Sequence, residues 1–239
     1  MTDQRTDSSA PDGEKAAIVD GEFYRPVFSP WHGYGEFKEI YAEAKPRTLV
    51  SADRCHALYS LAVQAAGLKG HWYECGVYQG GTAMLLARVL RVHQWETWDA
   101  DTQLHLFDTF EGMPETDPGE DRHAAGDFAN SSATEVQARL DAINPGLAAL
   151  HQGLIPETFA GLKAHRIAFA HVDVDIYRSV ADCCEFIHPR MVTGGFMVFD
   201  DYGFPSCPGA RRAVDEFFAD KPENPLVLPT GQAVVFKSP

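Results

Sequence analysis

The sequence has 239 residues, enough for one large domain with an ample hydrophobic core, and 45% of them are hydrophobic. Its 34 acidic and 20 basic residues give a formal net charge of −14, which would repel a phosphate backbone and argues against a nucleic-acid partner. No apolar stretch is long enough to span a membrane, and the polar start MTDQRTDSSAPDGEK lacks the apolar core of a signal peptide. Together with five cysteines that form no C-x-x-C pair, these features predict a soluble cytoplasmic protein with free thiols.

The first 50 residues are predicted to form two segments that precede the main domain. Residues 1–20 are polar and rich in Asp, Ser, Gly and Pro, a composition typical of a disordered tail. Residues 21–50 combine aromatic side chains with prolines and glycines, which predicts an irregular, packed cap or lid. The aromatic side chains could cover an apolar part of a ligand or pack at the surface or a subunit interface, and the sequence leaves both open for Phe23, Tyr24, Phe28, Trp31 and Tyr34.

From residue 51 onward, segments with helical and strand character alternate along the chain. Residues 51–67 are the first predicted helix, with Ser51 as its N-cap and Gly67 as its stop signal. Further helices are predicted at 80–92, 132–143, 156–163, 178–189 and 208–219. Strands are predicted at 71–77, 103–108, 149–153, 167–174 and 194–201, followed by a hairpin-like pair at 226–229 and 232–237. This alternation predicts an α/β fold, with a mostly parallel sheet covered by helices on both faces.

Acidic residues stand at or just past the ends of four predicted strands. They are Glu74, Asp108, the pair Asp173 and Asp175, and the pair Asp200 and Asp201. In open parallel sheets, ligands bind at the carboxyl ends of the strands, near the point where the strand order reverses. We therefore expect these acids to lie in one site.

A glycine-rich turn follows the first predicted strand, in the stretch YECGVYQGGTAMLL. Gly76 and Gly80 would let the backbone turn sharply and approach a ligand, although they could also serve only the strand-to-helix turn. Tyr78 stands where the dinucleotide fingerprint has its second glycine, and the sequence has no phosphate-binding G-x-x-x-x-G-K-[ST] loop. Asp108 could accept two hydrogen bonds from a ribose diol or cap its own loop. The combination suits a nucleoside without a pyrophosphate.

The later acids form a predicted metal site. Strand alternation puts His171, Asp173 and Asp175 on one side of the chain for as long as it stays extended. If the strand that precedes Asp200 and Asp201 is a neighbour, three or four carboxylates converge, which requires a proton or a cation among them. All-oxygen ligands favour Mg²⁺, with Mn²⁺ or Ca²⁺ as substitutes, although single acids could instead cap the helices that follow.

These stretches together resemble a known family. ECGVYQGGT, FDTFEGMP, HVDVDIY, FDDYG and GARRAVDEF are similar to motifs of the macrocin O-methyltransferases, metal-dependent enzymes that methylate sugar hydroxyls of antibiotics with S-adenosylmethionine. The resemblance covers residues 51–239 and implies a Rossmann-like, seven-stranded class I methyltransferase domain. It also implies a homo-oligomer.

The resemblance implies a role for each site residue. Asp173, Asp200 and Asp201 would bind Mg²⁺, and Asp175 would be the catalytic base, with His171 as an alternative base or a packed core residue. S-adenosylmethionine would contact Glu74, Gly76, Tyr78, Gly80, Thr82, Asp108, Thr109, Phe110, Gly126, Asp127, Gly153 and Asp173.

The acceptor implied by the resemblance is a sugar hydroxyl of a glycosylated natural product, with a phenol or catechol as the alternative. Two further interpretations stay open. A glycosyltransferase would use the D-x-D pair to hold a nucleotide diphosphate through Mn²⁺, but it leaves the glycine turn and the Asp200–Asp201 pair without a role. A non-catalytic scaffold would leave all four later acids without one.

Overall fold

A computed structural model of the protein describes residues 29–32, 35–93, 102–119 and 121–239. The predicted tail at 1–20 and most of the predicted cap at 21–50 lie outside the described residues, and so do Phe23, Tyr24, Phe28 and Tyr34. Trp31, which is described, packs against the hydrophobic core and not against the cavity described below.

Helices and strands alternate as the sequence predicts. The helices are α2 (Phe37–Ala44), α3 (Ala52–Ala65), α4 (Gly81–His93), α5 (Ala133–Ile143), α6 (Tyr177–Ile187) and α7 (Pro208–Phe218). Short 3₁₀ turns are η1 (Pro30–His32), η2 (Lys45–Arg47), η3 (Glu157–Phe159) and η4 (His188–Arg190). The strands are β1 (His71–Cys75), β2 (Leu104–Asp108), β3 (Ala148–Gln152), β4 (Ile167–Val172), β5 (Met191–Phe199), β6 (Leu226–Val227) and β7 (Ala233–Phe236).

The predicted helix at 156–163 is wrong. Only the 3₁₀ turn Glu157–Phe159 forms there. Gly161 adopts a left-handed φ of 85°, which leaves only four residues after Pro156 for a helix, too few for a stable α-helix.

The strands of the described chain form one seven-stranded sheet in the order β3-β2-β1-β4-β5-β7-β6. The first five strands in this order run parallel, whereas β7 is antiparallel to both β5 and β6. The order reverses between β1 and β4, because β2 and β3 are added on one side of β1, whereas β4 and the later strands are added on its other side. This confirms the predicted α/β class with a sheet of mostly parallel strands.

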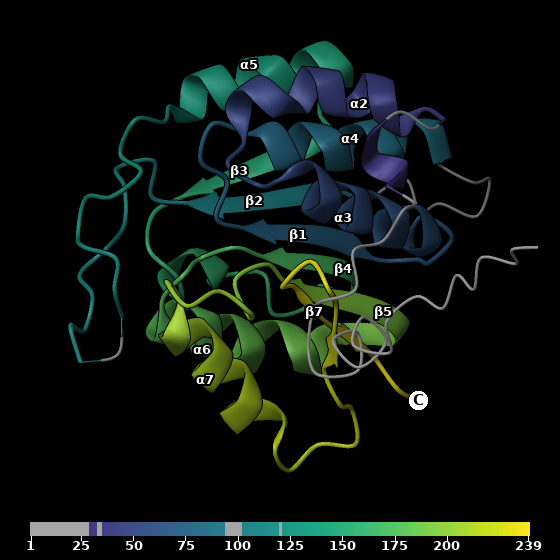
Figure 1. The fold of residues 1–239 in the computed structure, drawn as a ribbon. Helices are drawn as coiled ribbons and strands as arrows, with labels where there is room; N and C mark the ends of the chain where they lie inside the picture. Colours follow the sequence, from purple (N-terminus) through teal and green to yellow (C-terminus); the bar gives the residue numbers. More distant parts are fainter. Residues whose placement is uncertain (1–28, 33–34, 94–101, 120) are drawn as a thin grey trace, which may run out of the picture.

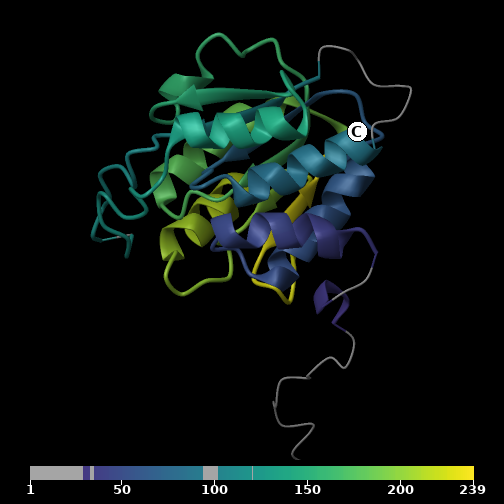
Figure 2. The same ribbon diagram turned by 90° about the horizontal axis from the view of Figure 1, so that it is seen from above.

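Helices cover both faces of the sheet and create two hydrophobic cores (Figure 1). Helices α2 to α5 pack on one face, where Trp72 of β1 is fully buried. Helices α6 and α7 pack on the other, where the next residue, Tyr73, is fully buried. Successive strand residues point to opposite faces, so continuous apolar runs such as IAFAHV fill both cores at once. Figure 2 shows α3, α4 and α5 side by side above the sheet.

No helix in the described parts of the chain is both long enough and apolar enough to cross a membrane.

Candidate active site

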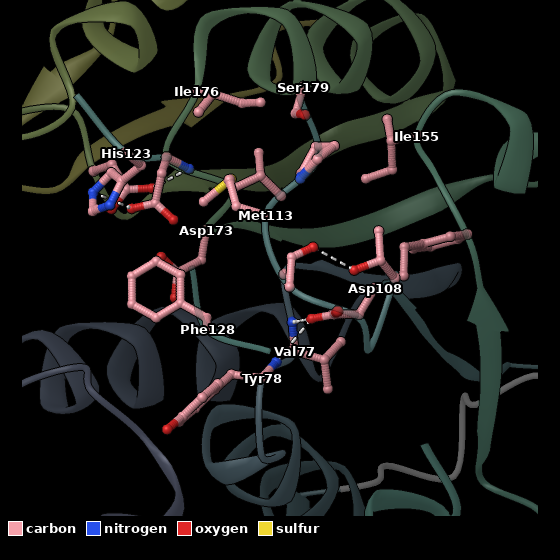
Figure 3. A pocket seen from close by; sticks show the side chains of 18 of the residues that line it. Val77, Tyr78, Asp108, Met113, His123, Phe128, Ile155, Asp173, Ile176 and Ser179 are labelled. Atoms are coloured by element: carbon pink, nitrogen blue, oxygen red, sulfur yellow. Dashed lines mark hydrogen bonds and ion pairs between the residues drawn. The ribbon is translucent and has the colours of Figure 1, made fainter. Parts of the chain in front are cut away.

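A large cavity opens at the carboxyl ends of the parallel strands, around the reversal between β1 and β4. Its volume of about 740 Å³ lies within the range of roughly 300–1,000 Å³ typical of small-molecule sites. Its wall is formed by the strand ends, the first turns of α6, residues 47–50 with Arg54, residues 153–157, parts of the loop between β2 and α5, and residues that precede α7. Tyr78, Asp108 and Asp173 face this space together with the loop residues Met113 and Phe128 (Figure 3).

Gly76 is required where β1 meets β4. It has a φ of 84°, and a Cβ atom at this position would lie 1.7 Å from the carbonyl oxygen of Asp173. The backbone N–H of Asp173 donates to the carbonyl of Cys75 at 2.8 Å, which holds the two strand ends together. Gly76 therefore allows the turn after β1 to lie directly against Asp173, the first candidate metal ligand. This conformational role of Gly76 is compatible with a role in binding a ligand.

Asp108 organises the glycine turn. Its Oδ2 accepts hydrogen bonds from the backbone N–H groups of Val77 at 2.7 Å and Tyr78 at 2.9 Å, and its Oδ1 accepts from Phe110 at 2.7 Å. A carboxylate offers about four acceptor positions, so about one remains for a ligand. Asp108 thus serves as the cap of its own loop and turn, and its predicted contact with a ribose diol remains a prediction.

Three carboxylates converge beside this turn. Asp173, Asp200 and Asp201 each place an oxygen within 4.8 Å of the other two. Burial, and then the charge of the neighbouring carboxylates, raise the pKa values of Asp173 and Asp201 well above the usual range. Burial also opposes the ionisation of Asp200, but His171 and Arg54 outweigh it and lower the pKa of Asp200. Full ionisation of the three carboxylates is therefore unfavourable unless a proton or a cation compensates their charge.

Two cationic groups compensate part of this charge. Arg54 of α3 forms an ion pair with Asp200, to which Gln232 also donates at 2.8 Å. His171 is fully buried, with Nδ1 3.1 Å from Glu74 and Nε2 3.7 Å from Asp200. Burial opposes its protonation, yet these two carboxylates raise the pKa of His171 to about 10. His171 does not line the cavity, which argues against its use as the base.

Asp175 is set apart from the cluster by the backbone. The extended run stops at Val172, and Asp175 adopts a left-handed φ of 58°, so the strand alternation does not reach it. Its backbone N–H donates to Oδ2 of Asp201 at 3.0 Å, while its carboxylate lies 3.6 Å from Nε2 of His123 and accepts from Cys207 at 3.4 Å. Burial raises the pKa of Asp175, and His123 opposes this rise.

The structure brings most of the predicted site residues to one cavity. Those that line it are Gly76, Tyr78, Thr82, Asp108, Thr109, Gly153, Asp173, Asp175 and Asp201. Those that do not are Glu74, Gly80, Phe110, Gly126, Asp127 and Asp200.

The predicted residues off the cavity wall have other contacts. Glu74 is fully buried behind the turn against His171, and Gly80 lies beside Val136 of α5. Gly126 and Asp127 pair with the backbone of Met113 and so shape the loop that lines the cavity. Their predicted contact with the cofactor remains a prediction.

Two residues of the site, Arg54 and His123, were not predicted from the sequence. Arg54 lies on a helix with ordinary amphipathic spacing, and His123 lies in a loop without periodicity, so no local motif marks either. His123 connects Asp175 with Asp127, whose Oδ2 lies 3.4 Å from the other ring nitrogen. Only the fold shows that both residues contact the acids.

The donor set fits a hard divalent cation. Among the described residues, Arg54 and His171 oppose the charge of Glu74 and the three clustered aspartates, and His123 faces Asp175; all the clustered ligand atoms are oxygens. Such oxygen ligands are those that Mg²⁺ and Ca²⁺ prefer. Asp173 and Asp201 face the cavity, whereas Asp200 would have to share its carboxylate between the cation and Arg54.

The model of the family described as macrocin-O-methyltransferase (TylF) matches residues 44–237 of this chain. The chain belongs to the macrocin-O-methyltransferase family. Membership confirms the resemblance found in the sequence, and the match extends seven residues ahead of the predicted domain start at 51. The glycosyltransferase and scaffold interpretations gain no support from it.

A relative with a known name is also an O-methyltransferase. The chain is 32% identical over 166 residues to 8-demethyl-8-(2,3-dimethoxy-alpha-L-rhamnosyl)-tetracenomycin-C 4'-O-methyltransferase of Streptomyces olivaceus, a match that covers 65% of this chain and 60% of that protein. The chain therefore spans about 60% of the length of this relative.

Solved structures confirm the class I O-methyltransferase fold. The O-methyltransferase NovP superposes with a TM-score of 0.70 at 21% identity, covering 84% of this chain and 88% of that one. TomG from Streptomyces achromogenes, an O-methyltransferase solved in complex with SAM, gives a TM-score of 0.55 at 17% identity, covering 87% and 92% of the two chains.

Proposed function

We propose that this chain transfers the methyl group of S-adenosylmethionine to a sugar hydroxyl of a glycosylated natural product, with a divalent cation, in the first place Mg²⁺, in the acid cluster. The observation that carries the proposal is that one cavity joins the glycine turn after β1 to the acids after β4 and β5. The rhamnosyl 4'-O-methyltransferase relative supports a sugar acceptor, and the SAM complex of TomG supports the methyl donor.

The methyl donor would lie against the turn from Gly76 to Tyr78, between Asp108 and the residues after β3. Thr109, Gly153 and Ile155 form this side of the cavity. The wall also contains apolar side chains such as Met113 and Phe128, which suit an adenine ring or the apolar part of an acceptor. This arrangement would place the methyl group toward the acids, in the middle of the cavity.

Methyl transfer is an in-line displacement in which an oxygen–carbon bond forms, the sulfur–carbon bond breaks and the hydroxyl proton leaves. Asp173, Asp200 and Asp201 would hold the cation, which when bound lowers the pKa of a coordinated hydroxyl and fixes its direction. Asp175 would accept the proton, because it lines the cavity next to Asp201 without belonging to the three-carboxylate cluster.

The test is a methyl-transfer assay with S-adenosylmethionine, a set of deoxysugar glycosides, their aglycones and simple catechols. We expect product only from glycosides, and we expect excess EDTA to abolish turnover and added Mg²⁺ to restore it. Undiminished turnover in EDTA would contradict the metal requirement. Methylation of catechols or aglycones alone would contradict the sugar acceptor, and failure to bind S-adenosylmethionine in calorimetry would contradict the proposal as a whole.

The sequence also predicted self-association and a cytoplasmic location, and both remain predictions.

A further inference from the structure

Arg54 connects helix α3 with the acid cluster of the candidate active site. It stands in the first turn of α3 and lines the cavity. Its guanidinium forms an ion pair with Oδ2 of Asp200, whose side chain is fully buried, and its own side chain is only 14% exposed. A buried carboxylate needs a partner of this kind, because an unpaired charge in the interior is strongly destabilising.

Other contacts hold the guanidinium in place without the acid cluster. Nε donates to Oγ of Ser51 at 3.2 Å, and Nη2 donates to the backbone carbonyl of Leu49 at 3.3 Å. The guanidinium carbon also lies 4.7 Å from the centroid of the Phe204 ring, a cation–π contact. Arg54 would therefore keep three contacts at the cavity wall if it gave up its ion pair with Asp200.

Both oxygens of Asp200 already have partners. Oδ1 accepts a hydrogen bond from Gln232 at 2.8 Å and lies 3.7 Å from Nε2 of His171, while Oδ2 pairs with Arg54. A magnesium ion binds a carboxylate oxygen at about 2.0–2.1 Å, so at Oδ2 it would meet the positive charge of the guanidinium.

The other two carboxylates of the cluster present no such competitor. In the described parts of the chain, neither Asp173 nor Asp201 forms an ion pair with a basic side chain. Asp201 accepts a hydrogen bond from the backbone N–H of Asp175 at 3.0 Å, which a cation at its other oxygen would not disturb. Competition between a cation and the protein's own positive charge is therefore concentrated at Asp200.

We propose that Arg54 is the internal counter-ion of the metal-free cluster, and that a divalent cation displaces it from Asp200. Arg54 thus acts through Asp200 as a positioning residue, which keeps this carboxylate charged and directed toward the cluster until the cation arrives. Because two positive groups repel each other at one carboxylate, the cation binds less tightly than it would without Arg54. The proposal rests on the proposed function, since it concerns the cation of that site.

Magnesium binding to Arg54→Gln provides the test. Glutamine keeps hydrogen-bonding groups but removes the charge, so calorimetry at fixed pH and ionic strength should show Mg²⁺ bound about tenfold or more tighter than in the wild type. Arg54→Lys keeps a positive charge and should bind Mg²⁺ more weakly than Arg54→Gln.

Thermal melting separates this role from a purely structural one. Without Mg²⁺, Arg54→Gln should melt below the wild type, because the buried carboxylate of Asp200 loses its ion pair. At saturating Mg²⁺ this difference should shrink, because the cation takes the place of the guanidinium. A purely structural arginine would leave the difference the same with and without Mg²⁺, and the Mg²⁺ affinity unchanged.

Two further variants serve as controls, and circular dichroism verifies the fold of each in saturating Mg²⁺. Arg178→Gln removes the same charge from another arginine of the cavity wall, which pairs with Asp182 at 2.9 Å, and should change the Mg²⁺ affinity much less. Arg54→Gln combined with Asp200→Asn should bind Mg²⁺ as Asp200→Asn alone does, because the effect of Arg54 passes through Asp200.

The outcomes distinguish this proposal from the proposed function. If the wild type binds Mg²⁺ but Arg54→Gln binds it no tighter, or if Arg178→Gln tightens binding equally, the role of Arg54 is overturned and the cation site stands. A variant Arg54→Gln that stays unfolded in saturating Mg²⁺ also overturns it, because the cation then does not replace the guanidinium. Absence of Mg²⁺ binding to the wild type would overturn the cation site and this proposal together.

Discussion

Asp175 and His123 are the pair of residues on which the proposed proton transfer depends. Asp175 follows a buried strand and was recognisable in the sequence because it repeats the position of Asp173 two residues later. His123 was not recognisable, because its loop has neither periodicity nor a motif. Residues that a strand delivers to the sheet edge can be predicted, whereas residues that a long loop brings there depend on the folded path of that loop.

Asp175→Asn tests the base directly. An amide of nearly the same shape cannot accept the hydroxyl proton, so we expect the single-turnover rate of methyl transfer to fall by about 10²–10⁴-fold. Mg²⁺ affinity, measured by calorimetry, should change little because Asp175 does not belong to the three-carboxylate cluster. His123→Gln is the matched comparison, and we expect a smaller loss because it leaves the carboxylate in place. A wild-type rate for Asp175→Asn would remove this residue as the base.

At the scale of elements, the junction of β1 and β4 determines where the site forms. Its strands were predictable from apolar runs bounded by turn residues, and so was the glycine turn. The contact between Gly76 and the carbonyl of Asp173 was not, because it joins residues nearly one hundred positions apart and depends on the register of two parallel strands. The periodicity of a sequence predicts which side chains of a strand share a face of the sheet, but it does not predict which strand lies beside it.

Gly76→Ala tests this junction. The added methyl group would overlap the backbone of Asp173, so relief requires the two strand ends to separate. We expect the free energy of unfolding in urea to fall by about 2–4 kcal/mol, from overpacking together with left-handed strain. Gly161→Ala is the control, because that glycine has a similar φ of 85° with nothing within 4 Å of the added atom. We expect about 1 kcal/mol there, and equal losses in the two variants would show that strain alone explains the effect.

At the scale of the whole molecule, part of the excess of acidic over basic residues is concentrated in the buried cluster of Asp173, Asp200 and Asp201. The net charge of −14 argued against a nucleic-acid partner but did not reveal this concentration. Burial and mutual repulsion raise the pKa values of Asp173 and Asp201, so the cluster is expected to oppose folding until a cation binds.

Thermal melting with and without Mg²⁺ tests this balance. Mg²⁺ at about one hundred times its dissociation constant should stabilise the fold by about 2.7 kcal/mol, which raises the melting temperature by several degrees. Asp201→Asn should respond much less, and without Mg²⁺ it should melt no lower than the wild type because it removes one of the repelling charges. An equal Mg²⁺ response in both proteins would contradict a cation in the cluster.

Asp200 contacts both Arg54 and Gln232, and these three residues are synthesised at very different times. Gln232 donates to Asp200 and, more weakly, to the backbone carbonyl of Arg54, which lies 178 positions earlier. A ribosome therefore releases the arginine long before either of its partners. During synthesis, the acids after β4 emerge from the ribosome before Gln232 and strand β7 exist. A nascent chain therefore cannot complete the contacts of Asp200 until nearly all residues from Arg54 to Gln232 have left the exit tunnel.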